Sequence, residues 1–187
     1  INNALLCLLS LFLLVLPIFV QTKFSITLPN VLEITLYLFI FSAEILGEIN
    51  NFYHLIPYWD TILHTLNGFL ATAIGFSLID LLNKNSEKFS LSPIYLCLFA
   101  FCFSMTIGVF WEFFEYTADK FFSWDMQKDE IVNRISSVTL GDIESNEPDI
   151  IKNIDRTILY DKDGNIVASV NDGYLAIGLN DTMGDLF

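Results

Sequence analysis

The sequence predicts an all-α protein, a polytopic bundle of transmembrane helices with a small extramembrane segment that contains a β-hairpin. Three observations predict this fold. The 187 residues are 53% hydrophobic and 17% charged, with a mean hydropathy of +0.53, whereas soluble domains are about a quarter charged. Several apolar stretches approach the roughly 20 residues that cross a bilayer. A longer polar stretch follows them and carries strand and turn patterns.

The apolar stretches fill the first part of the chain. They lie near residues 2–21, 31–48, 59–82 and 93–118. The first resembles the core of a signal peptide, but no basic region precedes it and no small-residue cleavage site follows it, so a spanning helix fits better. We therefore expect four transmembrane helices in residues 1–118. Because the chain starts at Ile1 and ends within a new apolar pattern, we also expect it to be a fragment.

Residues 119–173 are predicted to form an acidic extramembrane segment. Within it, RTILY and NIVASV flank an Asp-Gly turn, which indicates a hairpin of two short strands. A fifth spanning helix is expected from about Tyr174, so that residues 174–187 form its start.

The turn of this hairpin also invites a calcium-loop interpretation. Asp161, Asp163, Asn165 and Asp172 stand at ligand positions one, three, five and twelve of such a loop. However, Gly164 comes two places too early and the last ligand is not Glu. The hairpin is the stronger interpretation.

Charge and cysteine patterns restrict the partners of the protein. With 9 basic and 22 acidic residues the net charge is -13, which disfavours nucleic acid. The lipid bilayer is the expected partner, together with a cation or a protein that docks on the acidic segment. Cys7, Cys97 and Cys102 lie in apolar runs without paired spacing, so we expect buried hydrophobic residues rather than disulfides or thiolate ligands.

Lysines in the short loops predict the orientation. Lys23, Lys84 and Lys88 lie in loops on one side, and the loop 49–58 on the other side has no Lys or Arg. The positive-inside rule therefore predicts that the lysine loops are cytoplasmic and that residues 119–173 are extracytoplasmic.

Acidic side chains gather at one predicted membrane face, where the second and fourth helices end and the third and fifth begin. The candidate ligands of a divalent metal ion are Asp60, His64, Glu112, Glu115, Asp119, Asp181 and Asp185. A supporting outer set comprises Glu44, Glu48, Gln127 and Asp129.

Helical spacing groups these candidates into faces. Asp60, His64 and Asn67 share one face, which continues through the small residues Gly68 and Gly75 and should therefore point into the bundle. The fourth-helix acids at 112, 115 and 119 form a second face.

Charge energetics leave a metal site and simple hydration of the acids as alternatives. Hydration suffices to explain Asp60 and Asp181, because the helix macrodipole stabilises each by about 0.3–1 kcal/mol. The same dipole opposes Glu112 near a helix C-terminus, and burial of such an acid costs about 3 kcal/mol. Oxygen ligands with one imidazole suit Mg, Mn, Ca, Zn or Fe(II).

Three functional alternatives follow from the cluster. The first is a metal-dependent membrane enzyme, in which the ion would activate water or polarise a phosphate or ester. The others are a proton- or ion-coupled transporter and a structural or assembly component without catalysis. The chain contains no G-x-S-x-G, H-E-x-x-H, P-loop or dinucleotide motif, so no catalytic residue is assigned.

Four motifs in order resemble a known family. They are PYWDTILHTLNGF at 57–69, FWEFFEYTAD at 110–119, DMQKD at 125–129 and GLNDTMGDLF at 178–187. They resemble the YjdF-like family of bacterial integral membrane proteins, a domain of unknown function, in its Clostridium-like form.

The resemblance covers roughly residues 30–187 and implies a multi-pass protein of the bacterial cell membrane with no known activity. The family pattern includes Gln127 and Asp129 as well as the candidate ligands named above. Gly184 stands where a lysine is expected in many relatives, so a countercharge is missing here.

Overall fold

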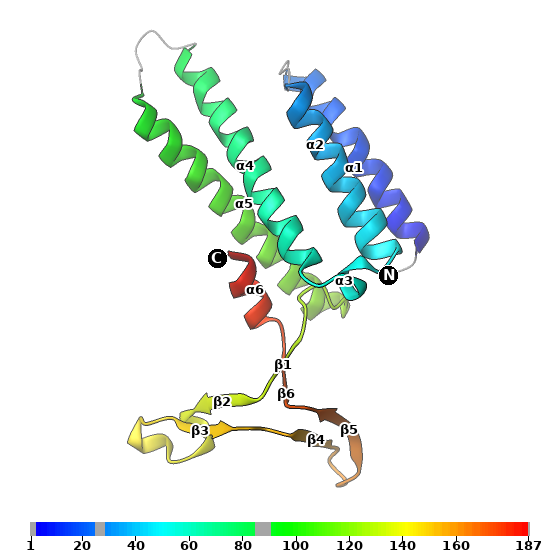
Figure 1. Ribbon diagram of the computed structural model, residues 1–187, viewed down its shortest axis with the longest axis vertical. Coiled ribbons are helices and arrows are strands. Elements are labelled where there is room, and N and C mark those ends of the chain that lie inside the picture. Colours follow the sequence, from blue (N-terminus) through cyan, green and yellow to red (C-terminus); the bar gives the residue numbers. More distant parts are fainter. Residues whose placement is uncertain (1–2, 25–28, 85–90, 187) are drawn as a thin grey trace. The chain divides into compact units, whose positions relative to one another are not determined.

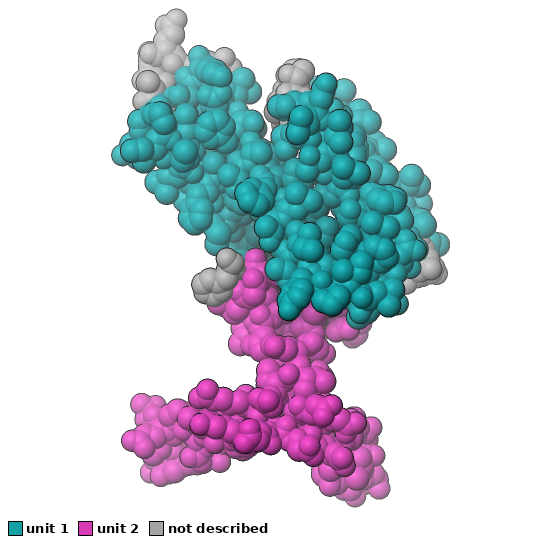
Figure 2. Space-filling view, viewed as in Figure 1, with its two compact units in different colours: residues 1–114, 186 teal, residues 115–185, 187 magenta. Residues whose placement is uncertain are grey.

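The chain divides into two compact units in a computed structural model that describes residues 3–24, 29–84 and 91–186. Unit 1 comprises residues 1–114 with 186, and unit 2 comprises residues 115–185 with 187 (Figure 2). The division falls inside one long helix, α5.

Unit 1 is helical, and each of the four predicted apolar stretches forms a helix (Figure 1). Its elements are α1 (Asn3–Phe24), α2 (Asn30–Ile40), the π-helix η1 (Phe41–Ile49), α3 (Phe52–Leu55), α4 (Trp59–Lys84) and α5 (Pro93–Phe122). Prolines mark two of the helix starts, since Pro29 precedes α2 and Pro93 opens α5, where its missing N–H costs nothing. α5 continues four residues past the predicted end at residue 118.

Within the described residues, two helices are long and apolar enough to cross a membrane, α4 with 26 residues and α5 with 30. At 1.5 Å per residue they measure about 39 and 45 Å, more than the roughly 30 Å of a hydrocarbon core. Large apolar side chains on both helices point outward, for example Phe69 at 71% and Phe110 at 64% exposure. Outward apolar faces are expected where the surrounding solvent is lipid.

The prediction that the cysteines are buried is wrong. Cys7, Cys97 and Cys102 are all exposed. The reason is that hydropathy shows that a helix is apolar but not which of its faces packs against protein, and these three side chains lie on outward faces.

Small residues bring α4 and α5 together, as the predicted inward orientation of their face requires. Ser104 Oγ donates a hydrogen bond of 2.9 Å to the Gly68 carbonyl oxygen across the two helices. A Cβ at Gly75 would lie 2.8 Å from the Phe103 ring, so only glycine allows this approach.

Unit 2 contains three antiparallel strand pairs and a short helix. The pairs are β1 (Glu130–Val132) with β6 (Tyr174–Ala176), β2 (Arg134–Ser137) with β3 (Asp149–Lys152), and β4 (Arg156–Tyr160) with β5 (Ile166–Asn171). Two 3-10 turns, η2 (Val138–Leu140) and η3 (Ile143–Ser145), lie between β2 and β3, and α6 (Leu179–Leu186) follows β6.

The predicted hairpin is confirmed by the β4–β5 pair. In its turn, Asp161 Oδ1 accepts hydrogen bonds from the backbone N–H groups of Asp163 (2.9 Å) and Asn165 (2.8 Å), and Gly164 adopts a φ of 83°. Asn165 Nδ2 also donates to Asp161 Oδ2 at 3.0 Å. The Asp161 carboxylate therefore stabilises the turn, which agrees with the hairpin rather than the calcium loop.

The predicted fifth spanning helix corresponds to α6. The prediction that it begins near Tyr174 is wrong, because α6 begins at Leu179. Residues 174–176 form β6, in which Val132 pairs with Tyr174 and Glu130 with Ala176. Glycines flank this strand where the backbone requires them. A Cβ at Gly173 would lie 2.6 Å from the Val132 carbonyl oxygen, and Gly178 has a φ of 65°. The strand is too short to show an alternating pattern in the sequence.

Candidate functional site

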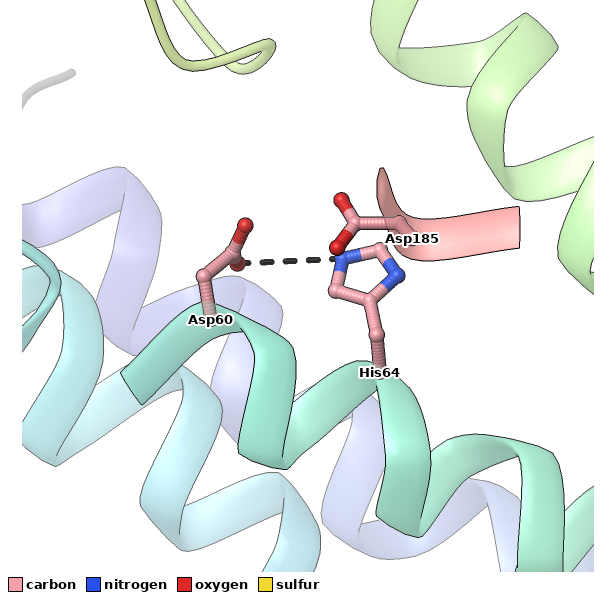
Figure 3. A group of neighbouring side chains, drawn as sticks. All are labelled: Asp60, His64 and Asp185. Carbon is pink, nitrogen blue, oxygen red and sulfur yellow. Dashed lines mark ion pairs between the residues drawn. The ribbon is translucent and has the colours of Figure 1, made fainter. Parts of the chain in front are cut away.

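His64 and Asp60 form the first part of the candidate site, on α4 in unit 1. Four residues apart, they project from one face of the helix, and Figure 3 shows the pair side by side. His64 Nε2 lies 3.7 Å from Asp60 Oδ1. The side chains are 14% and 26% exposed, respectively. This spacing allows both groups to contact one ion.

Glu112 of α5 faces the other side of the same imidazole. Its Oε1 lies 3.8 Å from His64 Nδ1, and its side chain is only 4% exposed. Each ring nitrogen of His64 therefore faces a carboxylate, one from its own helix and one from α5. Both distances are too long for direct hydrogen bonds, and the contacts are ion pairs only when the imidazole is protonated.

The buried side of α5 follows a three-residue spacing. Glu112, Glu115 and Ala118 are 4%, 6% and 2% exposed. Such a spacing places side chains on one helical face, as the sequence predicts for 112 and 115. Two carboxylates on a buried face carry a desolvation cost that ordinary surface acids do not have.

The two glutamates of η1 lie in different surroundings. Glu44 is half-buried, and its Oε2 is enclosed without a hydrogen-bond partner among the residues that the structure describes. Glu48 is exposed. The prediction that both support the metal ligands stays a prediction.

Two predicted ligands in unit 2 are hydrogen-bonded to the backbone. The Asp119 carboxylate accepts from the N–H of Met126 at 2.6 Å through Oδ1 and from that of Gln127 at 2.8 Å through Oδ2. Asp181 Oδ2 accepts from the N–H of Lys128 at 2.7 Å. These carboxylates therefore fix the chain that follows α5, a role that sequence reasoning missed. The polar stretch after Phe122, the last residue of α5, was its only visible signal.

Side chains reinforce the same loop. Gln127 Nε2 donates to Thr182 Oγ1 at 2.6 Å, and Asn180 Nδ2 donates to Glu130 Oε2 at 2.6 Å. Gln127, predicted to support a metal, is thus committed to a contact with α6.

Asp129 is exposed and has a perturbed pKa. Partial desolvation, and after it repulsion from Asp125 and Asp119, raises the pKa of the Asp129 carboxyl, while a backbone hydrogen bond from Gly178 opposes the rise. Acids therefore crowd the end of α5 within unit 2.

The remaining predicted residues are placed as follows. Asp185 lies one turn after Asp181 on α6 and is half-buried. His54, predicted to be a surface residue, is exposed on α3. Unit 1 brings Asp60, His64 and Glu112 together. That Glu115, Asp119, Asp181 and Asp185 join His64 in one site stays a prediction.

Comparisons with known proteins identify the family. Residues 2–145 match the family described as "Predicted membrane protein (DUF2238)". An uncharacterized protein from Thermotoga maritima is 32% identical over 93 residues, which cover 50% of this chain and 46% of the relative. The match therefore spans about half the length of that relative, and no solved structure matches the chain. The chain belongs to the DUF2238 family of predicted membrane proteins, as its membrane-family resemblance predicts.

Proposed function

We propose that the protein binds a divalent cation at a carboxylate–histidine site centred on Asp60 and His64. The observation that carries this proposal is the position of the His64 imidazole between Asp60 and Glu112. These residues lie on the two described helices that are long and apolar enough to cross a membrane.

The charge of the three groups supports a cation. Two carboxylates with a protonated imidazole carry a net charge of -1, and with a neutral imidazole a net charge of -2. In a low-dielectric helix bundle such an excess is expensive, and a divalent ion compensates for it directly.

The donor set indicates the kind of ion and its chemistry. Carboxylate oxygens with one imidazole suit Mn, Fe(II) or Zn, and also Mg or Ca when further oxygens contribute. On the sequence argument alone, we add Glu115, Asp119, Asp181 and Asp185 as proposed ligands, and Glu44, Glu48, Gln127 and Asp129 as their support. In an enzyme the ion would activate water or polarise a phosphate or ester near the membrane surface.

The proposed setting is a multi-pass protein of the bacterial cell membrane. α1 and the continuous pair α2–η1 would span it in addition to α4 and α5, with α6 as the start of a fifth helix. The lysines near the ends of α1 and α4 favour a cytoplasmic position for those ends, which makes residues 119–173 extracytoplasmic.

Metal analysis of the full-length protein tests the proposed site. The protein carries a histidine-free affinity tag, and a chelator removes bound metal from it in detergent. It is then equilibrated with Mn²⁺, Zn²⁺, Mg²⁺ or Ca²⁺, each alone, and the bound metal is measured by mass spectrometry. We expect one equivalent of at least one ion, and a loss of affinity of about 10-fold or more in His64→Ala and Asp60→Asn.

The matched control is His54→Ala, which removes the other histidine of the chain and should bind like the wild type. Absence of stoichiometric metal in the wild type, or an equal loss in His54→Ala, would refute the site.

The same geometry favours proton transfer as a second candidate. An imidazole with a carboxylate at each ring nitrogen accepts a proton at one nitrogen and releases one from the other. Reconstituted vesicles under an imposed pH gradient would then show proton flux that His64→Ala abolishes and His54→Ala preserves. Wild-type flux equal to that of empty vesicles excludes this candidate.

A further inference from the structure

We infer that Glu112 does not bind the cation but positions His64 for it. In this arrangement His64 Nε2 and Asp60 bind the ion, while Glu112 Oε1, 3.8 Å from Nδ1 in the metal-free protein, moves to hydrogen-bond distance and holds the proton on Nδ1. The inference rests on the proposed cation site and assigns different roles to the two carboxylates that face the imidazole.

The chemistry of the ring forces such a division. A neutral imidazole has one nitrogen with a free lone pair, which can bind a metal, and one N–H, which can only donate. Metal-bound histidines usually donate this second N–H to a carboxylate or carbonyl, which fixes the tautomer and the ring orientation. Of Asp60 and Glu112, therefore, one neighbours the ion and the other receives the N–H.

Distances alone do not choose between them. Two ligand atoms that are each about 2.1 Å from one ion lie at most about 4.2 Å apart. The separations of 3.7 Å at Nε2 and 3.8 Å at Nδ1 both satisfy this limit. The choice must come from the surroundings of the two carboxylates.

Burial favours Asp60 as the neighbour of the ion. Asp60 is 26% exposed and lies in the first turn of α4. Glu112 is 4% exposed and lies about three turns before α5 ends. A divalent ion that arrives with bound water and retains some of it needs the more open side. A charge-assisted hydrogen bond to an N–H donor also stabilises a buried carboxylate more than an exposed one, because water solvates the buried charge less.

Isotope-edited NMR of the metal-loaded protein shows directly which ring nitrogen of His64 binds the ion and which carries the proton. The 187-residue chain with His54→Ala is labelled with ¹⁵N-histidine, which leaves His64 as its sole histidine, and is loaded with ¹¹³Cd²⁺. We expect a ¹¹³Cd coupling at Nε2 and a protonated Nδ1. Coupling at Nδ1 would overturn the inference and leave the cation site intact. Absence of bound cadmium at His64 would reject the site, and the inference with it.

Variants at Glu112 test the positioning role separately. Glu112→Ala removes the acceptor, so cadmium affinity should fall about 10- to 100-fold and the Nδ1 proton signal should broaden or move. Glu112→Gln keeps an acceptor oxygen for the Nδ1 proton, so it should retain the Nε2 coupling and lose less affinity than Glu112→Ala.

Glu33→Gln is the matched control, since Glu33 is a half-buried carboxylate of α2 that contacts Gln21 and Tyr37. It should leave both the affinity and the coupling pattern unchanged. If Glu112→Gln instead loses as much affinity as Asp60→Asn while the fold is preserved by circular dichroism, Glu112 is a ligand and the inference is wrong.

Discussion

The acids of unit 1 and unit 2 find different kinds of partner. In unit 1, the side chains of Asp60 and Glu112 face the imidazole of His64 at 3.7 and 3.8 Å. In unit 2, Asp119 and Asp181 accept hydrogen bonds from backbone N–H groups. A carboxylate held by backbone donors stabilises the fold, whereas one that faces an imidazole can respond to a ligand. Similar spacing of acids in a sequence therefore supports two different roles.

The largest effect is expected from Asp119→Ala. This change removes two charge-assisted hydrogen bonds to the backbone, at Met126 and Gln127, and should cost about 2–4 kcal/mol in the stability of unit 2. Hydrogen exchange should rise first in residues 125–128. If exchange there is unchanged while cation binding falls, Asp119 is a ligand and the comparison between the units fails.

Asp60→Asn should weaken cation binding and leave the stability of the metal-free protein nearly unchanged. The change keeps the shape of the side chain but removes a charge that faces His64, so cation affinity should fall about 10- to 100-fold. The melting temperature of the metal-free protein should change little, because Asp60 is partly solvated. Calorimetric titration and thermal unfolding of one preparation give both values. A large drop in the metal-free melting temperature would place Asp60 with the structural acids.

Asp181→Asn should have an intermediate effect on stability, and it tests whether an acid of unit 2 is structural or binds the cation. Replacing the charged acceptor of the Lys128 N–H by an amide oxygen weakens one backbone hydrogen bond and should cost about 1 kcal/mol. Hydrogen exchange at Lys128 measures this loss. A parallel titration decides whether Asp181 also binds the cation, since a 10-fold loss of affinity would support the ligand role that the sequence predicts.

The smallest effect is a pH dependence of the β4–β5 hairpin. Hydrogen bonds from the Asn165 side chain first, and then from backbone N–H groups, lower the pKa of Asp161. Its stabilising contribution is therefore fully present above the ordinary aspartate pKa of about 3.9 and is lost as the pH falls through the lower pKa of the folded state. Amide exchange in the turn should be constant from pH 8 to about pH 5, apart from its intrinsic rate, and should accelerate near pH 3.

Asp163→Asn is the control for this titration, because Asp163 contributes its backbone N–H to the turn. It should keep the acid transition, and Asp161→Asn should remove it. Persistence of the transition in Asp161→Asn would assign it to another acid.

Local patterns in the sequence predicted most of the fold. An apolar stretch of about 20 residues predicts a helix, because a segment that crosses lipid must satisfy its own backbone hydrogen bonds, and two strands joined by an Asp-Gly turn pair with each other. The β1–β6 pair was not predictable, because three-residue strands from positions 130–132 and 174–176 show no periodicity and join distant parts of the chain. Hydropathy also failed for the cysteines, since it does not distinguish burial in protein from burial in lipid.

Local spacing and helix order also predicted part of the candidate site, the grouping of Asp60, His64 and Glu112. The i,i+4 spacing placed His64 beside Asp60, and counting helices across the membrane placed Glu112 at the same depth. The backbone contacts of Asp119 were not predictable, because they depend on the course of the loop after α5, where Ser123 and Asp125 adopt positive φ angles. The sequence alone does not distinguish a carboxylate that accepts backbone hydrogen bonds from one that faces an imidazole.

The hydrogen bond from Ser104 to the Gly68 carbonyl has a consequence for how this protein can change. Lipid supplies no hydrophobic force that presses two helices together, so a polar contact between spans, worth about 0.6 kcal/mol, helps to set their sliding position. Gly68 lies one turn from His64 on α4, and Ser104 lies on the same helix as Glu112. In the proposed cation site, a hydroxyl that never touches the ion would therefore tune the metal preference, and variation at position 104 is a place to look for this effect.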